Sequence, residues 1–392
     1  MYYRSMRKNP SLFSILLTGF SLFSAFWALR LAYAEYLFRS TGQVNRAITL
    51  APGNPDYAVR SGDFRRAVQL NPYHSEAWIE LALQAEISGK YADAEAHLMR
   101  ANEVDKTFAP RWAAANFYFR QQKDEQFWRW MRLATERSYG DMTALYRLAW
   151  RYTDDSRCIL DRMIPNNAEF LGSYLDFLKK EMRWRAAAEA AEKYARAGGS
   201  SGKMLELCEE LLSQQQVLRA RQVWKLWEGR RASTAEPANL LSNPKLSWKP
   251  SGMGFDWRLP WREGVVQRWV ETTGEMRILL DGRQDEHTEL LTQIVPVAPD
   301  GFYSFRYQYR PHRVPARTGL RWRGTCTPGG NRSFEQLIEG DGESWSEKKI
   351  EFRTSMNCEL LQLRLLYERL PGTARIEADF SVAGPFVLVR SR

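Results

Sequence analysis

Hydrophobic and polar positions follow three different patterns along the chain, and each pattern marks a separate region. Residues 11–29 carry no charge. At about 1.5 Å rise per residue, such a run is just long enough to cross a hydrocarbon core as one helix. Apolar positions then recur with helical spacing to about residue 230, and beyond residue 250 they form short alternating runs typical of strands. We therefore predict a multidomain α-then-β chain. Its expected parts are a cytoplasmic stub and transmembrane helix (1–39, with the span at about 11–29), an α-solenoid (40–230), a linker (231–250) and an antiparallel β-sandwich or jelly roll (251–392).

The N-terminal run has two interpretations. Arg4, Arg7 and Lys8 precede it, so the positive-inside rule keeps the N-terminus in the cytoplasm and exports the rest. An uncleaved anchor would make this a single-pass inner-membrane protein with a periplasmic, or otherwise extracytoplasmic, bulk. The sequence 32–34 (Ala-Tyr-Ala) also resembles the cleavage site of a signal peptide. The length of the run favours the anchor, and residues 31–39 still read as helix, as if the anchor continued into the first repeat.

A period of 34 residues recurs in the middle of the chain. Trp78, Trp112 and Tyr146 follow one another at this interval. Around Trp78, the small residues Ala82 and Ala94 would let two helices approach closely across a turn. The pattern predicts a stack of about five helical hairpins.

These residues resemble the tetratricopeptide repeat family over about residues 40–230. The resemblance implies a curved surface whose concave face binds a protein partner. Asn116 and Arg120 are the groove residues that we expect, although a solvated helix face is an equally good interpretation of each. Trp128 stands where the family has a small alanine, and we interpret it as a packing residue. The third repeat has a short second helix near residues 158–163.

The C-terminal region is predicted to contain about nine strands, without intervening helices. One strand has a clear inner face, because Tyr303, Phe305, Tyr307 and Tyr309 alternate with polar residues. The expected strands are 265–270, 276–280, 290–297, 302–310, 320–325, 345–352, 360–367, 374–380 and 385–389.

The order of parts in this region resembles the galactose-binding-type jelly rolls found among carbohydrate-binding modules. The similar segments are 243–246 (Asn-Pro-Lys-Leu), 254–257 (Gly-Phe-Asp-Trp) and 301–303 (Gly-Phe-Tyr). Sugar recognition needs exposed aromatic faces with polar groups beside them. The candidate saccharide site is one loop cluster: Trp257, Trp261, Asp256, Arg258 and Arg262. The alternative is that the two tryptophans plug one end of the sandwich.

A second loop, with Asp281, Asp285 and Glu286, could hold a structural calcium of the kind this fold often carries, but a solvated acidic turn is the favoured interpretation. Cys326 and Cys358 could form a disulfide in an oxidising compartment. Strand parity argues against that pair unless a bulge intervenes, so the sequence leaves it open. The other two cysteines read as buried free thiols, and no metal site is expected.

The net charge of +10 comes mostly from arginines scattered through every segment. Such scatter does not favour a nucleic-acid partner. The four histidines are dispersed, and the carboxylate pair 209–210 reads as an exposed helix face. We therefore expect no catalysis and no cofactor. The predicted function is a membrane-anchored scaffold that binds proteins through its repeats and saccharide through its sandwich. By analogy of architecture, its setting would be envelope or exopolysaccharide assembly. A purely structural sandwich and a cryptic glycan-active enzyme are the alternatives.

Overall fold

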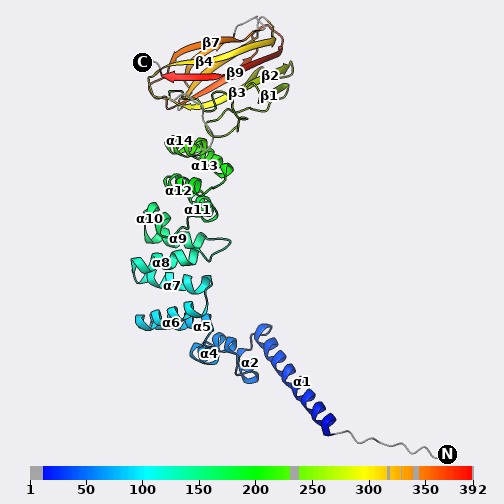
Figure 1. Ribbon diagram of the computed structural model, residues 1–392, viewed down its shortest axis with the longest axis vertical. Helices are drawn as coiled ribbons and strands as arrows, with labels where there is room; N and C mark the ends of the chain where they lie inside the picture. The colour runs from blue at the N-terminus through cyan, green and yellow to red at the C-terminus, as the bar shows by residue number, and fades with distance from the viewer. Residues whose placement is uncertain (1–11, 230–237, 316–317, 328, 339–343, 391–392) are drawn as a thin grey trace, which may run out of the picture. The chain divides into compact units, whose positions relative to one another are not determined.

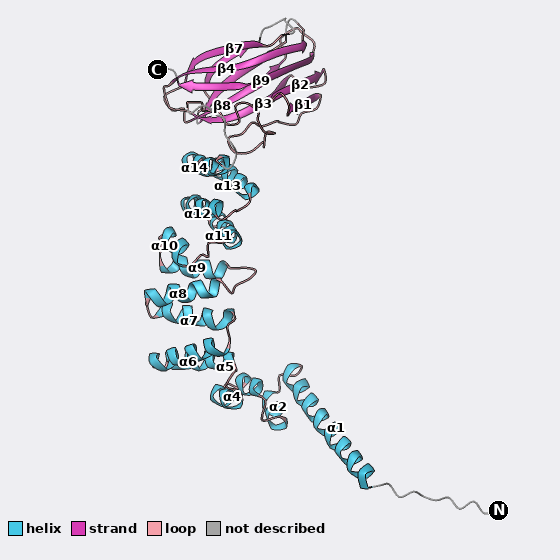
Figure 2. Ribbon diagram, viewed as in Figure 1, coloured by secondary structure: helices cyan, strands magenta, loops and turns pink. Residues whose placement is uncertain are grey.

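A computed structural model (Figure 1) describes the chain except for residues 1–11, 230–237, 316–317, 328, 339–343 and 391–392. The cytoplasmic stub with Arg4, Arg7 and Lys8, and the first part of the expected linker, lie outside the described residues. The chain forms two structural units, residues 1–165 and 166–392. The predicted class is confirmed, because the described residues form helices followed by two antiparallel sheets (Figure 2).

The first unit contains ten helices in its described part. Their bounds are α1 (Leu12–Arg39), α2 (Val44–Leu50), α3 (Pro55–Arg60), α4 (Phe64–Leu70), α5 (Ser75–Ile87), α6 (Tyr91–Val104), α7 (Phe108–Arg120), α8 (Asp124–Thr135), α9 (Thr143–Tyr152) and α10 (Ser156–Arg162). Consecutive helices pack as pairs from α1/α2 to α7/α8, whereas α9 and α10 each contact α8. The short α10 agrees with the predicted short second helix of the third repeat.

Small side chains bring the paired helices together. In the α5/α6 hairpin, Ala82 and Ala94 are buried at the contact, as their spacing predicted. The turn between the helices contains Gly89 at φ +73°, a left-handed conformation that glycine adopts without steric cost.

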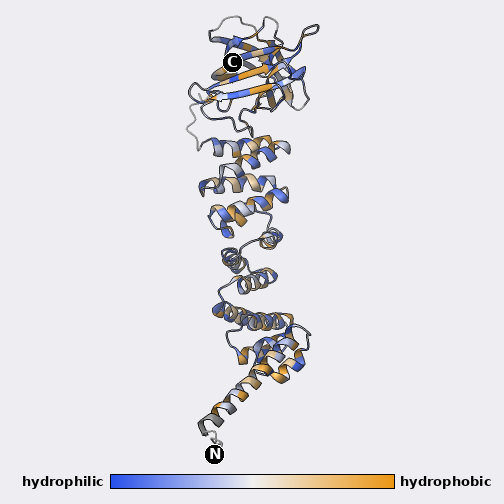
Figure 3. Ribbon diagram, turned by 90° about the vertical axis from the view of Figure 1, so that its right-hand side faces the viewer, coloured by the Kyte–Doolittle hydropathy of each residue, from blue (hydrophilic) through white to orange (hydrophobic). Residues whose placement is uncertain are grey.

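Helix α1 is continuous from the apolar run into the first hairpin. It is the one helix among the described residues that is long and apolar enough to cross a membrane, judged by length and composition. Its apolar side chains are exposed between Leu16 and Leu31 (orange in Figure 3), whereas Ala34 and Leu37 are buried against α2 and Tyr57. The apolar run and the start of the first repeat are therefore parts of one continuous helix, as the sequence predicted.

The second unit contains the last four helices and nine strands among its described residues. The helices are α11 (Ala168–Lys180), α12 (Trp184–Arg196), α13 (Ser201–Ser213) and α14 (Val217–Glu228). The strands are β1 (Val265–Val270), β2 (Glu275–Asp281), β3 (His287–Pro296), β4 (Phe302–Arg313), β5 (Leu320–Thr327), β6 (Arg332–Leu337), β7 (Ser346–Arg353), β8 (Leu360–Glu368) and β9 (Glu377–Arg390).

Two sheets with strand orders β1-β2-β9-β4-β7 and β3-β8-β5-β6 enclose one core. Tyr303, Phe305, Tyr307 and Tyr309 point into this core, as their alternation predicted. The core begins earlier in the chain than expected. Leu241 and Leu246 belong to it although they lie in the expected linker, so the described part of that segment is integral to the sandwich.

Nine strands were predicted, and the described residues form nine. The numbers agree because one observed strand was not predicted and one observed strand was predicted as two. Strand β6 was not predicted, because apart from Phe334 it is largely polar and exposed. The expected strands 374–380 and 385–389 are a single strand, β9, which pairs with β4 across a register shift between Arg306 and Gln308. The Gly384-Pro385 sequence, which reads as a break, lies inside this strand.

A disulfide joins Cys326 to Cys358, and this settles the question that strand parity left open. Cys326 lies on β5, whereas Cys358 precedes the first residue of β8. Side chains alternate between the two faces of a sheet only along an extended strand. The parity argument therefore does not apply to Cys358, which lies before the strand begins. Cys208 is buried and free, and Cys158 is half-buried and free.

Candidate functional site

The predicted groove residues line an apolar hollow on one side of α5, α6 and α7. Its volume is about 200 Å³. The apolar residues that line it are Ile79, Ala82, Leu83, Leu98, Trp112, Ala113 and Phe117, and the polar ones are Glu86, Asn116 and Arg120. Leu83 is 43% exposed, which leaves apolar surface open to solvent. A hollow of this size and composition suits one bulky apolar side chain of a partner.

The polar residues of the hollow are engaged with one another or with their own helix. The Arg120 guanidinium donates to both carboxylate oxygens of Glu86, at 2.7 and 2.6 Å. This hydrogen bonding raises the pKa of Arg120 above its usual range. The Asn116 amide donates to the Trp112 carbonyl at 2.8 Å. The ion pair therefore links α7 to α5 at the hollow.

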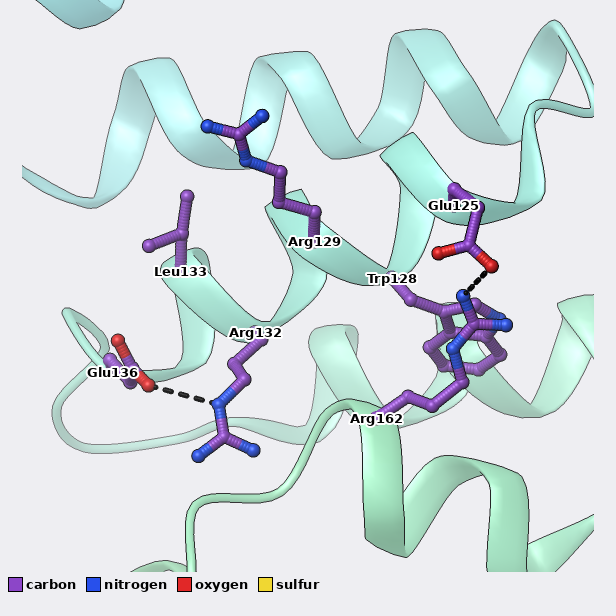
Figure 4. A pocket seen from close by; sticks show the side chains of 7 residues that line it. All are labelled: Glu125, Trp128, Arg129, Arg132, Leu133, Glu136 and Arg162. Atoms are coloured by element: carbon purple, nitrogen blue, oxygen red, sulfur yellow. Dashed lines mark hydrogen bonds and ion pairs between the residues drawn. The ribbon is translucent and has the colours of Figure 1, made fainter.

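A second hollow, of about 440 Å³, lies between α8 and α10 (Figure 4). Arg162 reaches across it to Glu125 at 2.8 Å, with its guanidinium 5.7 Å from the centre of the Trp128 ring. Trp128 itself is buried, which confirms that it packs. The short helix α10 supplies Arg162, whose guanidinium covers the Trp128 ring. Most charged residues that line this hollow pair with another lining residue. Arg162 pairs with Glu125, and Arg132 pairs with Glu136 at 3.1 Å.

The loop cluster expected to bind saccharide is not assembled as one site. Trp257 is fully buried, packs against Phe386 and Trp322, and donates its Nε1–H to the Asn243 carbonyl. Its ring has no face left for a sugar, so this part of the prediction is corrected in favour of the plug. Trp261 is 81% exposed, and Arg262 beside it donates to the Trp261 carbonyl.

Asp256 is a structural residue of the same loop. Its carboxylate is buried and accepts hydrogen bonds from the Ser251 N–H (2.9 Å), the Trp248 indole (3.2 Å) and the Trp257 N–H (2.8 Å). Burial raises the pKa of Asp256, and these hydrogen bonds oppose that effect by favouring the charged form. Because these donors surround the buried carboxylate, Asp256 holds the shape of the loop and is closed to a ligand.

Arg258 binds the helical array. Its guanidinium donates to both oxygens of Glu209 on α13, at 2.8 and 2.9 Å. The Gly254 N–H donates to the same carboxylate at 2.7 Å. The sequence marked Glu209 as part of an exposed acidic pair, and nothing local could reveal a partner 49 residues further along the chain.

Apolar packing completes this contact, which we call the junction (Glu209, Cys208 and Trp224 with the loop 254–258). Phe255 contacts the Trp224 ring edge-on at 6.0 Å between ring centres. Burial raises the pKa of Cys208 to about 12. A Cβ on Gly254 would lie 2.6 Å from Trp224, so only glycine fits there. The last hairpin and the sandwich thus share one packed, hydrogen-bonded contact.

The acidic loop of the sandwich is neutralised by arginines. Asp281 pairs with Arg283 at 2.8 Å, and Glu286 pairs with Arg369 at 3.0 Å. The Asp285 carbonyl accepts from Thr288. Within the part of the chain that the structure describes, His, Cys, Asp and Glu do not form a group of three or more that could hold a metal ion. The loop is therefore described best as a solvated turn with ion pairs.

Comparison with known proteins finds no matching family model and no matching curated protein. Solved structures show distant similarity. One is TmCBM61 in complex with β-1,4-galactotriose, which is 19% identical and covers 39% of this chain and 99% of its own, with a TM-score of 0.27. A family 16 carbohydrate-binding module is 18% identical, with coverages of 38% and 99% and a TM-score of 0.27. YrrB, described as a tetratricopeptide protein with an unusual peptide-binding site, is 10% identical, with coverages of 52% and 86% and a TM-score of 0.19. At these scores the similarities carry no argument about function.

Proposed function

We propose that this protein is a membrane-anchored extracytoplasmic scaffold that acts by binding and not by catalysis. The observation that carries the proposal is the hollow on α5–α7, where open apolar surface lies beside the Arg120–Glu86 pair. An apolar pocket with a few oriented polar groups is a typical recognition site for a side chain of a partner. Its polar groups are already paired, which suits docking and offers no free acid, base or nucleophile.

The apolar helix is proposed to stay in the mature protein as the anchor. Ala34 is fully buried against the first hairpin, and the Arg30 Nε–H donates to the Leu50 carbonyl at 2.8 Å. Cleavage after Ala34 would remove both contacts and leave the last carbonyls of α2 without this donor. The disulfide supports an oxidising, extracytoplasmic location for the other end of the chain. Intact-mass measurement of the membrane-extracted protein tests retention, because a mass lacking residues 1–34 would contradict it.

The sandwich is proposed to serve first as a cap on the last helical hairpin. Stacked repeats need a terminal unit that covers the open end of their core. The junction provides this cover through Glu209, Arg258 and Trp224. This role corresponds to the structural alternative for the sandwich.

Saccharide binding is a second candidate function, and the observation in its favour is Trp261. An exposed tryptophan beside an arginine is the kind of surface on which a sugar ring can stack. A glycan array on the full chain in detergent, compared with Trp261→Ala, tests it. If the sandwich binds saccharide through Trp261, the wild type should bind specific glycans on the array and Trp261→Ala should not. Unchanged binding, or none, would leave the cap as the sandwich's only proposed role.

The protein-binding proposal is tested by quantitative capture from solubilised membranes. We expect Ala113→Trp, which fills the hollow, to reduce capture of a discrete partner at least about tenfold, as loss of a buried anchor side chain does. Leu218→Trp is the matched control, because Leu218 is 78% exposed on α14 and outside the hollow. Equal capture by both variants would contradict the proposal.

A further inference from the structure

Unpaired positive charge gathers in the first helical pairs. Residues 30–72 hold six arginines and three carboxylates. The carboxylates are engaged: Glu35 pairs with Arg39, Asp56 pairs with His74, and Asp63 caps α4 through the Arg66 N–H. Within the described part of the chain, the other five arginines have no carboxylate within ion-pair distance. They are Arg30, Arg46, Arg60, Arg65 and Arg66. Elsewhere, many arginines of the described chain are paired, as Arg120, Arg258 and Arg323 are.

Two of these arginines lie at the same end of α2. Arg30 donates to the Leu50 carbonyl at 2.8 Å and to the Thr49 carbonyl at 3.5 Å. Arg66 donates to the Pro52 carbonyl at 3.3 Å, in the turn that follows α2. Both guanidinium groups therefore contact the backbone at the end of α2 or in the turn 51–54 that follows it.

The position of this turn along α1 is defined by Arg30. Arg30 is the first charged residue after the uncharged run. Its guanidinium lies 4.8 Å from the centre of the Trp27 ring, and Tyr33 follows at 55% exposure. Tryptophan, tyrosine and arginine at the end of an apolar helix mark the boundary between hydrocarbon and headgroups. Because α2 returns along α1 to Arg30, its end lies at that boundary.

We propose that the turn 51–54, with Arg30 and Arg66, is a surface that binds the headgroups of anionic phospholipids. This proposal rests on the anchoring role of α1 proposed above. Guanidinium groups bind phosphate oxygens with directed, charge-assisted hydrogen bonds. An anionic leaflet attracts such a basic segment next to a membrane helix. The first helical pairs are thereby held against the bilayer in one orientation, without a flexible tether.

A fluorophore at residue 53 tests this contact in the full chain. Gly53→Cys is a suitable label site, because a Cβ there meets nothing within 4 Å. The half-buried Cys158 is replaced by serine to avoid a second label. The protein is inserted into nanodiscs of phosphatidylcholine with or without phosphatidylglycerol, and a small share of the lipids carries a nitroxide on the headgroup. We expect nitroxide quenching at residue 53 to be about two- to fivefold stronger in the anionic discs and to fall towards the neutral value at high salt.

Variants separate this proposal from the anchor. Arg66→Gln should remove most of the difference between anionic and neutral discs. Arg100→Gln, in a surface pair with Glu103 on α6, should leave it intact. Quenching that is equal in both kinds of disc, or unchanged by Arg66→Gln, would overturn the headgroup contact while leaving the anchor in place. Failure of the protein to co-elute with nanodiscs would instead contradict the anchor itself.

Discussion

Gly254 is the residue on which the junction depends most closely. Its φ of +57° and its hypothetical Cβ, 2.6 Å from Trp224, combine a left-handed backbone with a crowded site. Gly252 has a similar φ of +73°, but a Cβ there meets nothing within 4 Å. Substitution of either glycine strains the backbone, but only substitution of Gly254 also causes steric overlap. Comparing the two variants therefore distinguishes these effects.

We expect Gly254→Ala to destabilise the junction by about 1–3 kcal/mol more than Gly252→Ala, because only the former overpacks the contact. The measurement is the alkylation rate of Cys208, mapped by peptide mass. Cys208 is buried at the junction with a pKa of about 12, so it should react only when the contact opens. Equal rates in the two variants would show that Gly254 is not packed as described.

The Arg258–Glu209 pair gives a second prediction at this scale. Glu209→Gln keeps the shape of the side chain but removes the charge that accepts from Arg258 and Gly254. We expect a loss of about 1–3 kcal/mol at the junction, since a partly buried guanidinium loses its charged partner. Cys208 alkylation should rise accordingly.

The neighbouring residue provides the control for that change. Glu210 pairs with Lys179 of α11 at 3.0 Å and makes none of the contacts of Glu209 to the loop 254–258. Glu210→Gln should therefore leave Cys208 protected. Faster alkylation in both variants, or in neither, would contradict a specific role for Glu209.

The single-residue features also show what the sequence could reveal about the site. Asn116 and Arg120 were expected as groove residues from the resemblance to helical repeats, with a solvated helix face as the alternative, and both line the hollow. Trp257 and Arg258 were misplaced, because a sequence does not show which side of a loop faces a neighbour. Their partners, Phe386 and Glu209, lie far away along the chain.

Among the elements, strand β5 is joined by the disulfide to the turn that precedes β8, and the two strands also pair through their backbones. For a closed loop of 32 residues, loss of the disulfide should cost about 3–4 kcal/mol, mainly by freeing the unfolded chain. We expect reductant to lower the unfolding midpoint of the sandwich. It should have no further effect on the double variant Cys326→Ala, Cys358→Ala. A midpoint that does not respond to reductant would contradict the pairing.

The pairing of β2 with β9 includes an ion pair that gives a pH dependence. Arg277 donates to both oxygens of Asp379, at 2.9 and 2.6 Å, and this hydrogen bonding lowers the pKa of Asp379. A carboxylate with a lowered folded-state pKa stabilises the fold above its unfolded pKa. That stability is lost as pH falls through the folded value.

We therefore expect Asp379→Asn to be less stable than the wild type at neutral pH, by no more than about 1 kcal/mol because Arg277 is partly exposed. The difference should shrink below about pH 4, where the unfolded carboxylate takes up a proton, and disappear at the lower pH at which the folded carboxylate is protonated as well. Urea unfolding between pH 3 and 7 measures it, with Glu347→Gln as the control at an exposed, loosely paired site. A difference that is constant across this pH range would contradict the assignment.

Element prediction succeeded where a pattern repeats and failed where it does not. The helix pairs and the aromatic face of β4 follow from regular spacing of small and apolar residues. Strand β6 has little apolar pattern, because its side chains join a surface network in which Glu335 pairs with Arg321 and Arg323. The linker was predicted to extend to residue 250, although Leu241 and Leu246 belong to the sandwich core. Each is a single apolar residue among turn-forming residues, so no apolar pattern marked it as part of the sandwich.

At the scale of the whole molecule, each end of the helical array is fixed by a different means. In the first unit, α1 supplies buried residues to the first hairpin, so the apolar helix and the array are continuous. In the second unit, the sandwich packs on the last hairpin through the junction. Between these two ends of the chain's helical array, the hollow on α5–α7 is the surface that we propose binds a partner.

Photo-crosslinking in intact membranes shows whether the hollow on α5–α7 binds a partner. A photoreactive amino acid replaces Leu83, which lines the hollow, and in a second protein it replaces Tyr139, which is 92% exposed in the same unit. We predict one discrete adduct from position 83, and this adduct should disappear when Ala113→Trp fills the hollow. Position 139 should give no such adduct. The same adducts from both positions, or none from position 83, would contradict a partner site in the hollow.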